Sequence, residues 1–307
     1  MLMNDLNDLN DLNVDLTALS NSQLKIHNMY HIGVNVSFDK ISITANVIEK
    51  RLSDLANFIS FEPFVDVFED TQMHFRLRAL NNKIYMEYDK IKANARNRRN
   101  VKIEFNPNRL SYEEKVWLKT NLLCYVEDMS FTRLDLAFDF TENLSDYYIM
   151  TDIALTSLYR YGRDSNLETI YLGSKKSSRY IRVYDKKKEV KDTKNLELDV
   201  DNLWRVEFEL KGDYIDKWLC CFDDFHILKP DWKSANKIQD RAMLQLLLNH
   251  KEEWKNLENR SKRKYKNMIK DLSSLDLKKY MDKELEMKVN SLKDELSFWI
   301  KGYVYIS

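Results

Sequence analysis

The sequence of 307 residues contains few glycines, prolines and cysteines, and each shortage excludes a class of protein. The five glycines form neither the GxGxxG pattern of dinucleotide-binding folds nor the GxxxxGKS/T pattern of a phosphate-binding loop, so ATP hydrolysis through such a loop is excluded. Three cysteines, two of them adjacent, do not suit a disulfide framework and favour a reducing cytoplasm. No run approaches the roughly 18 apolar residues of a membrane span, and the N-terminal segment lacks the basic and then apolar pattern of a secretory signal. We therefore expect a cytoplasmic protein with no membrane partner.

The charged residues balance over the whole chain, with 49 basic and 49 acidic side chains, but not along it. Residues 90–102 carry six bases and no acid, residues 174–188 carry seven bases and one acid, and residues 251–270 carry eight bases and three acids. Residues 1–23 carry four aspartates and no base. Basic segments of this kind are either solvated surface or the contact area for a polyanion such as DNA.

The pattern of apolar residues predicts an α+β protein. Three Asn-Asp-Leu repeats in residues 4–12 indicate that residues 1–34 form an acidic low-complexity tail. A mostly antiparallel sheet domain with flanking helices is expected over residues 35–212, followed by an all-helical region over residues 213–307. Alternation predicts strands at 41–47, 83–88, 101–105, 131–140, 168–172, 179–185 and 203–211, and helices are expected at 51–60, 111–127, 145–159, 235–248, 252–270 and 275–300.

Three of these strands each have one apolar side and one side of charged residues and tyrosines, because side chains alternate along a strand. The polar sides converge if the strands are neighbours in one sheet. The simpler interpretation is an ordinary solvated face of an antiparallel sheet. The polar residues are Arg133, Asp135 and Asp139 in the first strand, Tyr180, Arg182, Tyr184 and Lys186 in or just after the second, and Arg205, Glu207, Glu209 and Lys211 in the third.

This combination of side chains suits phosphoryl transfer. Carboxylates without a nearby histidine or thiolate are hard oxygen ligands for Mg²⁺ or Mn²⁺. Tyr184 lies between Arg182 and Lys186, and a phenol needs local positive charge to react with a phosphodiester at neutral pH. An arginine on the same face would stabilise the charge of the transition state.

Three segments carry a resemblance to a known family. They are Tyr171–Lys188 (YLGSKKSSRYIRVYDKKK), Leu203–Glu207 (LWRVE) and Cys221–Trp232 (CFDDFHILKPDW). The first closely resembles the active-site segment of plasmid rolling-circle replication initiators, the Rep_trans family, and the resemblance extends from about Phe131 to the C-terminus. The His-hydrophobe-His triplet of the other rolling-circle nuclease class is absent from the five histidines.

The resemblance implies a metal-dependent, topoisomerase-like DNA endonuclease and strand transferase that acts as a homodimer. Such an initiator binds the double-strand origin of its plasmid and nicks one strand in a hairpin loop. It remains bound to the 5′ end through a tyrosine, recruits the host replicative helicase and ends replication by strand transfer. The family's nucleophile falls on Tyr184, with Arg182 and Arg133 as its expected catalytic partners. From the alternation of side chains along the strands, we expect Asp135 and Glu207 to be the metal ligands, with Asp139 as a third candidate.

DNA contacts are expected at two places. In the family, origin discrimination resides in a short segment that falls near residues 261–266 here, on the basic side of the expected helix at 252–270. Near the tyrosine, Lys175 stands where the family pattern has an arginine. The DNA-binding candidates are Lys175, Arg179, Lys186, Lys262, Arg263, Lys264, Tyr265 and Lys266.

Two other functions fit part of the pattern. A non-catalytic origin-binding protein or repressor would use the basic helix and need no tyrosine. A tyrosine recombinase would need an Arg…His-x-x-Arg pattern, which the sequence lacks.

Overall fold

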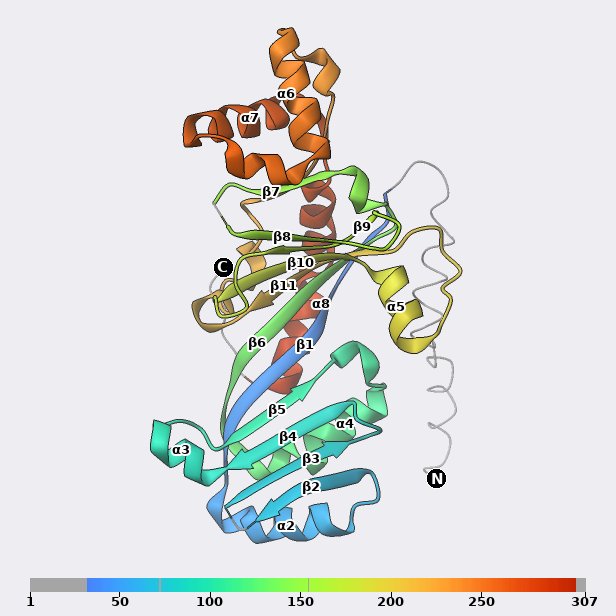
Figure 1. Ribbon diagram of the computed structural model, residues 1–307. Coiled ribbons are helices and arrows are strands. Elements are labelled where there is room, and N and C mark those ends of the chain that lie inside the picture. The colour runs from blue at the N-terminus through green and yellow to red at the C-terminus, as the bar shows by residue number, and fades with distance from the viewer. Residues whose placement is uncertain (1–31, 72, 154, 302–307) are drawn as a thin grey trace.

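The computed structural model describes residues 32–71, 73–153 and 155–301, so nearly all of the expected acidic tail at 1–34 lies outside the described residues. One large antiparallel sheet has the strand order β2-β3-β4-β5-β1-β6-β11-β10-β9-β8 (Figure 1). Its strands are β1 (Val34–Val47), β2 (Val65–Thr71), β3 (His74–Ala79), β4 (Ile84–Asp89), β5 (Val101–Phe105), β6 (Val126–Phe140), β8 (Ser157–Tyr161), β9 (Leu167–Leu172), β10 (Arg179–Asp185) and β11 (Trp204–Leu210). A smaller sheet has the order β13-β12-β7 and contains β7 (Tyr148–Thr151), β12 (Phe225–Pro230) and β13 (Ser273–Asp276).

The described residues also form helices that flank the large sheet, and α6 and α7 lie at one end of the molecule (Figure 1). The helices are α2 (Leu52–Phe61), α3 (Lys90–Arg96), α4 (Tyr112–Asn121), α5 (Lys186–Lys194), α6 (Ile238–Asn249), α7 (Asn259–Asp271) and α8 (Lys278–Trp299). The α+β class predicted from the sequence is confirmed. Among the described helices, none has the combination of length and apolar character that crossing a lipid bilayer requires.

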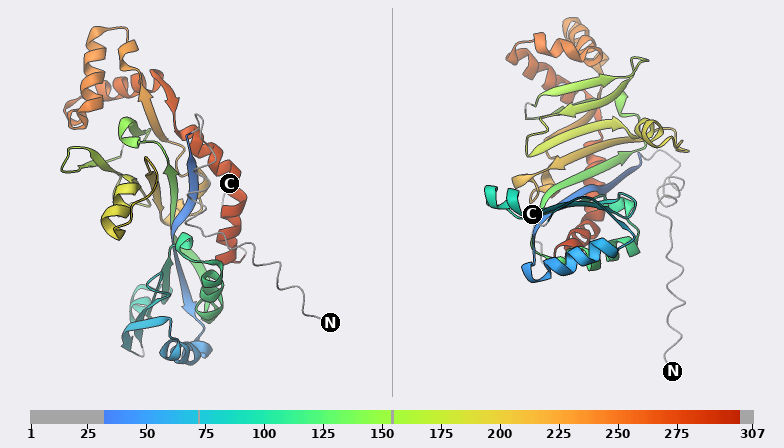
Figure 2. Two further views of the ribbon diagram at one scale, coloured as in Figure 1. Left: turned by 90° about the vertical axis from the view of Figure 1, so that its right-hand side faces the viewer. Right: turned by 60° about the horizontal axis from the view of Figure 1, so that its bottom comes forward.

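The long strands β1 and β6 connect the two halves of the sheet, and helix α8 crosses behind them (Figure 2). Most apolar side chains of these strands are buried, and they give the sheet one apolar face although β-bulges shift the phase of the alternation. Helix α8 covers this face with Met281, Leu285 and Trp299, and the Trp299 ring lies 4.5 Å from that of Phe105 on β5. Helix α8 therefore occupies the apolar side, whereas α5 lies on a different side of the strands (Figure 2).

A second, smaller core holds the helical lobe, which we define as α6 and α7 with the loop between them. Leu244 and Leu247 of α6 and Ile269 of α7 pack on Tyr148 and Met150 of β7. The chain after Gly212 therefore contributes to both cores, because α8 packs on the large sheet and α6 and α7 do not.

Two expectations about secondary structure are wrong. The expected helix at 145–159 is replaced by β7 and β8, and strands β12 and β13 follow Gly212, where only helices were expected. All four residues of β7 are buried, some in the main core and some against the helical lobe. A short segment with apolar residues on both sides has no hydrophobic periodicity, so its sequence does not distinguish a strand from a helix.

Two helix boundaries also differ from the expected ones. The helix expected at 252–270 begins only at Asn259, because Leu257 and Glu258 are extended and a 3-10 segment (Lys251–Asn256) precedes them. The helix expected at 111–127 ends at Asn121, although its capping box of Ser111 and Glu114 is confirmed.

His226 on β12 connects the three strands of the small sheet, because its partners are Asp276 of β13 and Asp152, which directly follows β7. Its Nδ1 lies 2.7 Å from Oδ2 of Asp276, and its Nε2 lies 3.3 Å from Oδ2 of Asp152. The hydrogen bond to Asp276 raises the pKa of His226, burial opposes the shift, and Asp152 adds to it. The protonated ring is therefore favoured in the folded protein.

We predict that stability depends on pH through His226. Since the pKa is raised on folding, the stabilisation is complete below the unfolded value of about 6.5 and is lost as the pH rises through the folded value. A half-exposed ion pair contributes up to about 1 kcal/mol, which corresponds to a Tm change of roughly 2–4 °C. The Tm difference between wild type and His226→Gln should be larger at pH 5.5 than at pH 9. The exposed His250, replaced by Gln, is the control; an equal difference at both pH values would contradict the assignment.

Candidate active site

The polar sides of β6, β11 and β10 lie on one face of the large sheet, as the sequence predicts. Tyr184 on β10 is opposite Arg205 on β11, which is opposite Asp139 on β6. One row away, Arg182 is opposite Glu207. The three strands are direct neighbours, so their tyrosine, arginine and carboxylate side chains meet.

Tyr184 is held by a carboxylate and lies close to two cations. Its hydroxyl donates a hydrogen bond of 3.3 Å to Oε2 of Glu207. The Arg182 guanidinium lies 5.5 Å from the centre of the tyrosine ring, and Nζ of Lys186 lies 5.6 Å from it. Burial raises the pKa of Tyr184 although Arg205 opposes the shift, so the phenol is protonated at neutral pH and needs an acceptor for its proton before it can attack.

Glu207 is the most deeply buried charged group at this site, with a relative exposure of 0%. One carboxylate oxygen forms an ion pair with Nη2 of Arg182, and the other accepts the hydrogen bond from Tyr184. Burial lowers the pKa of Arg182, but the Glu207 carboxylate more than reverses this effect and the net shift is upward. The buried charge of Glu207 is therefore paired, as a charge in an apolar interior must be.

A second pair, Arg133 and Asp135, lies on β6. Nε and Nη2 of Arg133 each lie 2.6 Å from an oxygen of Asp135, and Nη2 also lies 2.7 Å from Glu209. Burial raises the pKa of Asp135 in spite of the Arg133 hydrogen bonds, and the negative charge of Glu207 adds to the rise. A cation near Asp135 would oppose this rise, because an opposite charge favours the ionised form of a carboxyl group.

A third group at this site brings in a residue that sequence reasoning missed, Asp39 of β1. Arg205 donates to both oxygens of Asp139, at 2.6 and 2.7 Å, and also forms an ion pair with Asp39. Asp39 further accepts a hydrogen bond of 3.1 Å from Asn106. The sequence carries one indication of Asp39, which is that two polar residues, Asp39 and Lys40, are adjacent in an otherwise alternating strand. In the structure a β-bulge interrupts the pairing of β1 with β6 at this point.

The proposed metal ligands have suitable chemistry, but each of them faces an arginine. Asp135 is bound to Arg133, Glu207 to Arg182 and Asp139 to Arg205, so a cation at these carboxylates displaces an arginine. Within the described ranges, the one group of three ligand atoms within 4.8 Å of one another is formed elsewhere, by His74, Glu87 and Asp89. The hard oxygen donors of Asp135, Glu207 and Asp139 fit Mg²⁺ or Mn²⁺, and in each carboxylate both oxygens already have a protein partner.

Two of the expected DNA-binding residues have structural positions instead. Arg179 is buried and forms a bidentate ion pair with Asp224, and it also donates to the carbonyl oxygen of Cys221 at 2.7 Å. The ring of Tyr265 is buried in the core of the helical lobe, and its hydroxyl donates to Asp240 at 3.2 Å. Since neither side chain faces solvent, we correct both assignments from DNA contacts to packing.

The other candidates lie on the surface at the expected places. Lys175 is exposed in the loop before β10, and Lys186 is half-buried beside Tyr184. On α7, the exposed Arg263 and Lys264 border an open groove together with Arg260, Ser261 and Asn267. Lys262 and Lys266 are half-buried, and burial lowers the pKa of Lys266.

Comparison with known proteins identifies the family. A family model described as "Replication initiation protein, N-terminal" matches residues 40–126, and the Rep_trans model, described as "Replication initiation factor", matches residues 153–293. A replication initiation protein of Staphylococcus aureus is 46% identical over 300 residues, which cover 98% of this chain and 96% of the relative. A second one from the same organism is 45% identical over 291 residues, or 95% and 93% of the two chains. The chain therefore belongs to the Rep_trans family of replication initiation proteins, which confirms the resemblance.

One of the solved structures that the chain matches is a rolling-circle replication initiator protein from Geobacillus stearothermophilus. It superposes with a TM-score of 0.42 and 14% identity, over 68% of this chain and 91% of that chain.

Proposed function

We propose that this protein initiates plasmid rolling-circle replication in the cytoplasm by nicking one strand of the double-strand origin through Tyr184. The observation that carries the proposal is the Tyr184 hydroxyl, which donates to the buried Glu207 within a group of arginines. Membership of a replication initiation family supports the choice of DNA as the substrate. For the homodimer and for the host helicase as a partner, the support is the family resemblance alone.

The proposed step transfers the phosphoryl group from the 3′ oxygen to the tyrosine, so one phosphoester bond replaces another. Oη of Tyr184 attacks the phosphorus, the bond from phosphorus to the 3′ oxygen breaks, and the protein becomes linked to the 5′ phosphate. The phenol proton passes to Glu207, which already accepts its hydrogen bond, and the leaving 3′ oxygen takes a proton from water. Arg182 and Arg133 stabilise the negative charge of the transition state. In the reverse step a new 3′-hydroxyl attacks the phosphorus of the phosphotyrosine and releases the tyrosine. Strand transfer therefore needs no ATP.

A divalent cation belongs to the proposal as a Lewis acid that polarises the scissile phosphate. Asp135 and Glu207 are the ligands we propose for Mg²⁺ or Mn²⁺, since both are carboxylates on the face that carries Tyr184. Asp139 is the third ligand we propose, and its bidentate hydrogen bonds also position Arg205.

Origin recognition is proposed for the helical lobe. The exposed side of α7 carries Arg260, Arg263 and Lys264 around a groove, whereas its other side is fixed in the lobe core by Tyr265 and Ile269. A basic helix face of this kind contacts phosphates along duplex DNA, and a few of its side chains read base edges.

Replacing Tyr184 by Phe tests the nucleophile. The ring packing remains, and the loss of the hydroxyl should reduce nicking by a factor of roughly 10⁴ or more. The assay incubates a supercoiled plasmid that carries the double-strand origin with protein and Mg²⁺, and measures nicked circles with protein bound to the 5′ end. Tyr180→Phe, on the same face of β10, is the control and should nick normally. Undiminished nicking by Tyr184→Phe contradicts the assignment, and origin binding by wild type without any nicking favours the non-catalytic alternative.

Replacing Arg263 by Ala tests the recognition surface. Loss of one phosphate contact should weaken binding of the origin duplex and reduce the slope of log K against log salt by about 1, while cleavage of a preformed single strand persists. Fluorescence anisotropy at several salt concentrations measures this slope. The exposed Lys50, near α2 at the far end of the molecule, is the matched control as Lys50→Ala (Figure 1). Equal losses on duplex and single strand would refute a separate recognition surface.

A further inference from the structure

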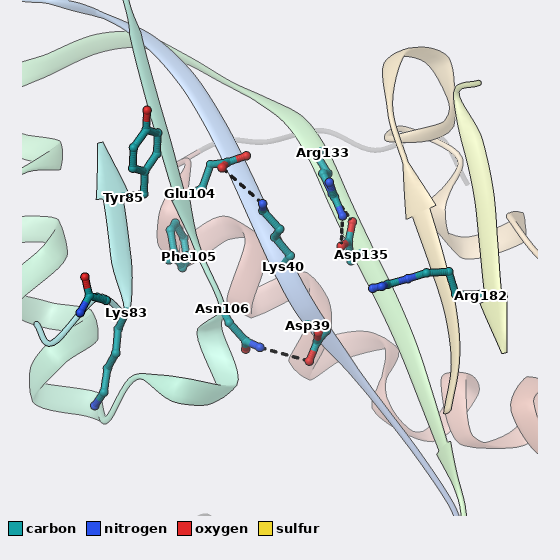
Figure 3. A pocket seen from close by; sticks show the side chains of 11 residues that line it. Asp39, Lys40, Lys83, Tyr85, Glu104, Phe105, Asn106, Arg133, Asp135 and Arg182 are labelled. Carbon is teal, nitrogen blue, oxygen red and sulfur yellow. Dashed lines mark hydrogen bonds and ion pairs between the residues drawn. The ribbon is translucent and has the colours of Figure 1, made fainter. Parts of the chain in front are cut away.

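The candidate active site opens into a pocket that the N-terminal half of the sheet helps to form. The pocket has a volume of about 280 Å³ and lies on the polar face (Figure 3). On one side it is lined by Arg133, Asp135 and Arg182, which belong to the proposed catalytic group. On the other side are residues of β1, β4 and β5, which belong to the segment before residue 126. The two halves of the sheet therefore share one site.

Lys40 lies in the middle of this pocket. It is the register partner of Asp135 on the neighbouring strand β6, and its Nζ lies 3.3 Å from an oxygen of Glu104. In Figure 3 its side chain lies between Glu104 on one side and the pair of Arg133 and Asp135 on the other. Glu104 is also bound by Lys102 and Ser42, so it remains satisfied when Lys40 turns toward another anion.

Tyr85 gives the pocket an aromatic wall. It lies on β4 directly opposite Glu104, and its half-buried ring is held by a hydrogen bond of 3.3 Å from its hydroxyl to Glu87. Asn106 stands at the other end of the pocket, where its side chain donates to Asp39. A fixed ring beside a lysine and an amide is the combination with which proteins hold a single-stranded nucleotide, through base stacking, phosphate contact and an edge contact.

We propose that this pocket is a subsite for one nucleotide of the single strand next to the scissile phosphate, with the base on Tyr85 and a phosphate beside Lys40. The inference rests on the proposed function, and it assigns to the N-terminal half of the chain a direct contact with the substrate strand. The volume lies just under the roughly 300 Å³ at which ligand pockets begin, which suits one nucleotide and not several.

The test compares two single strands that differ only in their bases, a labelled 12-mer of thymidine and a 12-mer of abasic deoxyribose phosphate. Binding is measured by fluorescence anisotropy in EDTA at one fixed salt concentration, so that no strand is cut. Tyr85→Ala should weaken binding of the thymidine strand roughly 5- to 100-fold, the range for one stacked base, and change binding of the abasic strand less than about 2-fold. Tyr85→Phe, which keeps the ring, should bind both strands as wild type does.

The controls keep the outcome clear. Tyr112→Ala removes an exposed tyrosine at the start of α4 and should change neither affinity. Lys40→Gln leaves the Tyr85 ring in place and should weaken the binding of both strands by the same factor, because it removes a phosphate contact. Equal effects of Tyr85→Ala on the two strands, or no effect on either, would overturn the subsite.

The binding test is independent of the nicking test. If wild type nicks the origin and Tyr85→Ala binds the thymidine strand normally, the subsite is wrong and the proposed function stands. If Tyr85→Ala selectively weakens the thymidine strand and wild type does not nick, the strand-binding pocket stands and the nicking function is wrong.

Discussion

The buried carboxylate of Glu207 is the constraint on which the rest of the site depends. With no exposure to solvent, its charge is tolerated only because Arg182 and Tyr184 both bind it, and these two residues lie on the neighbouring strand. A shift of β10 against β11 by one residue would turn both partners to the apolar face and leave the carboxylate unpaired. The same interaction therefore fixes the register of the two strands and directs the tyrosine hydroxyl to its hydrogen-bond acceptor.

Arginine–carboxylate pairs extend this arrangement across the neighbouring strands. Arg205 joins Asp139 of β6 to Asp39 of β1, and Arg133 joins Asp135 to Glu209 of β11. Both arginines connect neighbouring strands, so the polar face is held rigid by groups that also suit binding to phosphate. The apolar face is covered by α8, and the helical lobe has its own core. Catalysis and duplex recognition are thus proposed for separate surfaces, with the N-terminal half completing the first of them.

Much of the site follows from the two-residue period of strands. The alternation in 131–140, 179–185 and 203–211 predicts that Asp135, Tyr184 and Glu207 share one face, and the register of the three strands confirms this. Asp39 was not predicted because its position depends on a β-bulge and on the pairing of β1 with β6, whose residues are about one hundred positions apart in the sequence. The strand β7 was not predicted because it is buried on both sides, and β12 was not predicted because its apolar residues are divided between two cores that the sequence does not separate. Arg179 and Tyr265 were misassigned because charge and residue type do not reveal burial. Metal binding stays a prediction, since each nominated ligand faces an arginine.

The most direct test of the account is the nicking rate of Glu207→Gln on a supercoiled plasmid carrying the origin, with duplex affinity measured in parallel. If Glu207 accepts the proton of Tyr184, the amide should lower nicking at pH 7 by roughly 10²- to 10⁴-fold, recover part of the rate as the pH rises toward the phenol pKa, and bind the duplex as wild type does. Glu168→Gln, a substitution on β9 outside the site, is the matched control and should nick normally. Nicking by Glu207→Gln at the wild-type rate would contradict the central role of this carboxylate.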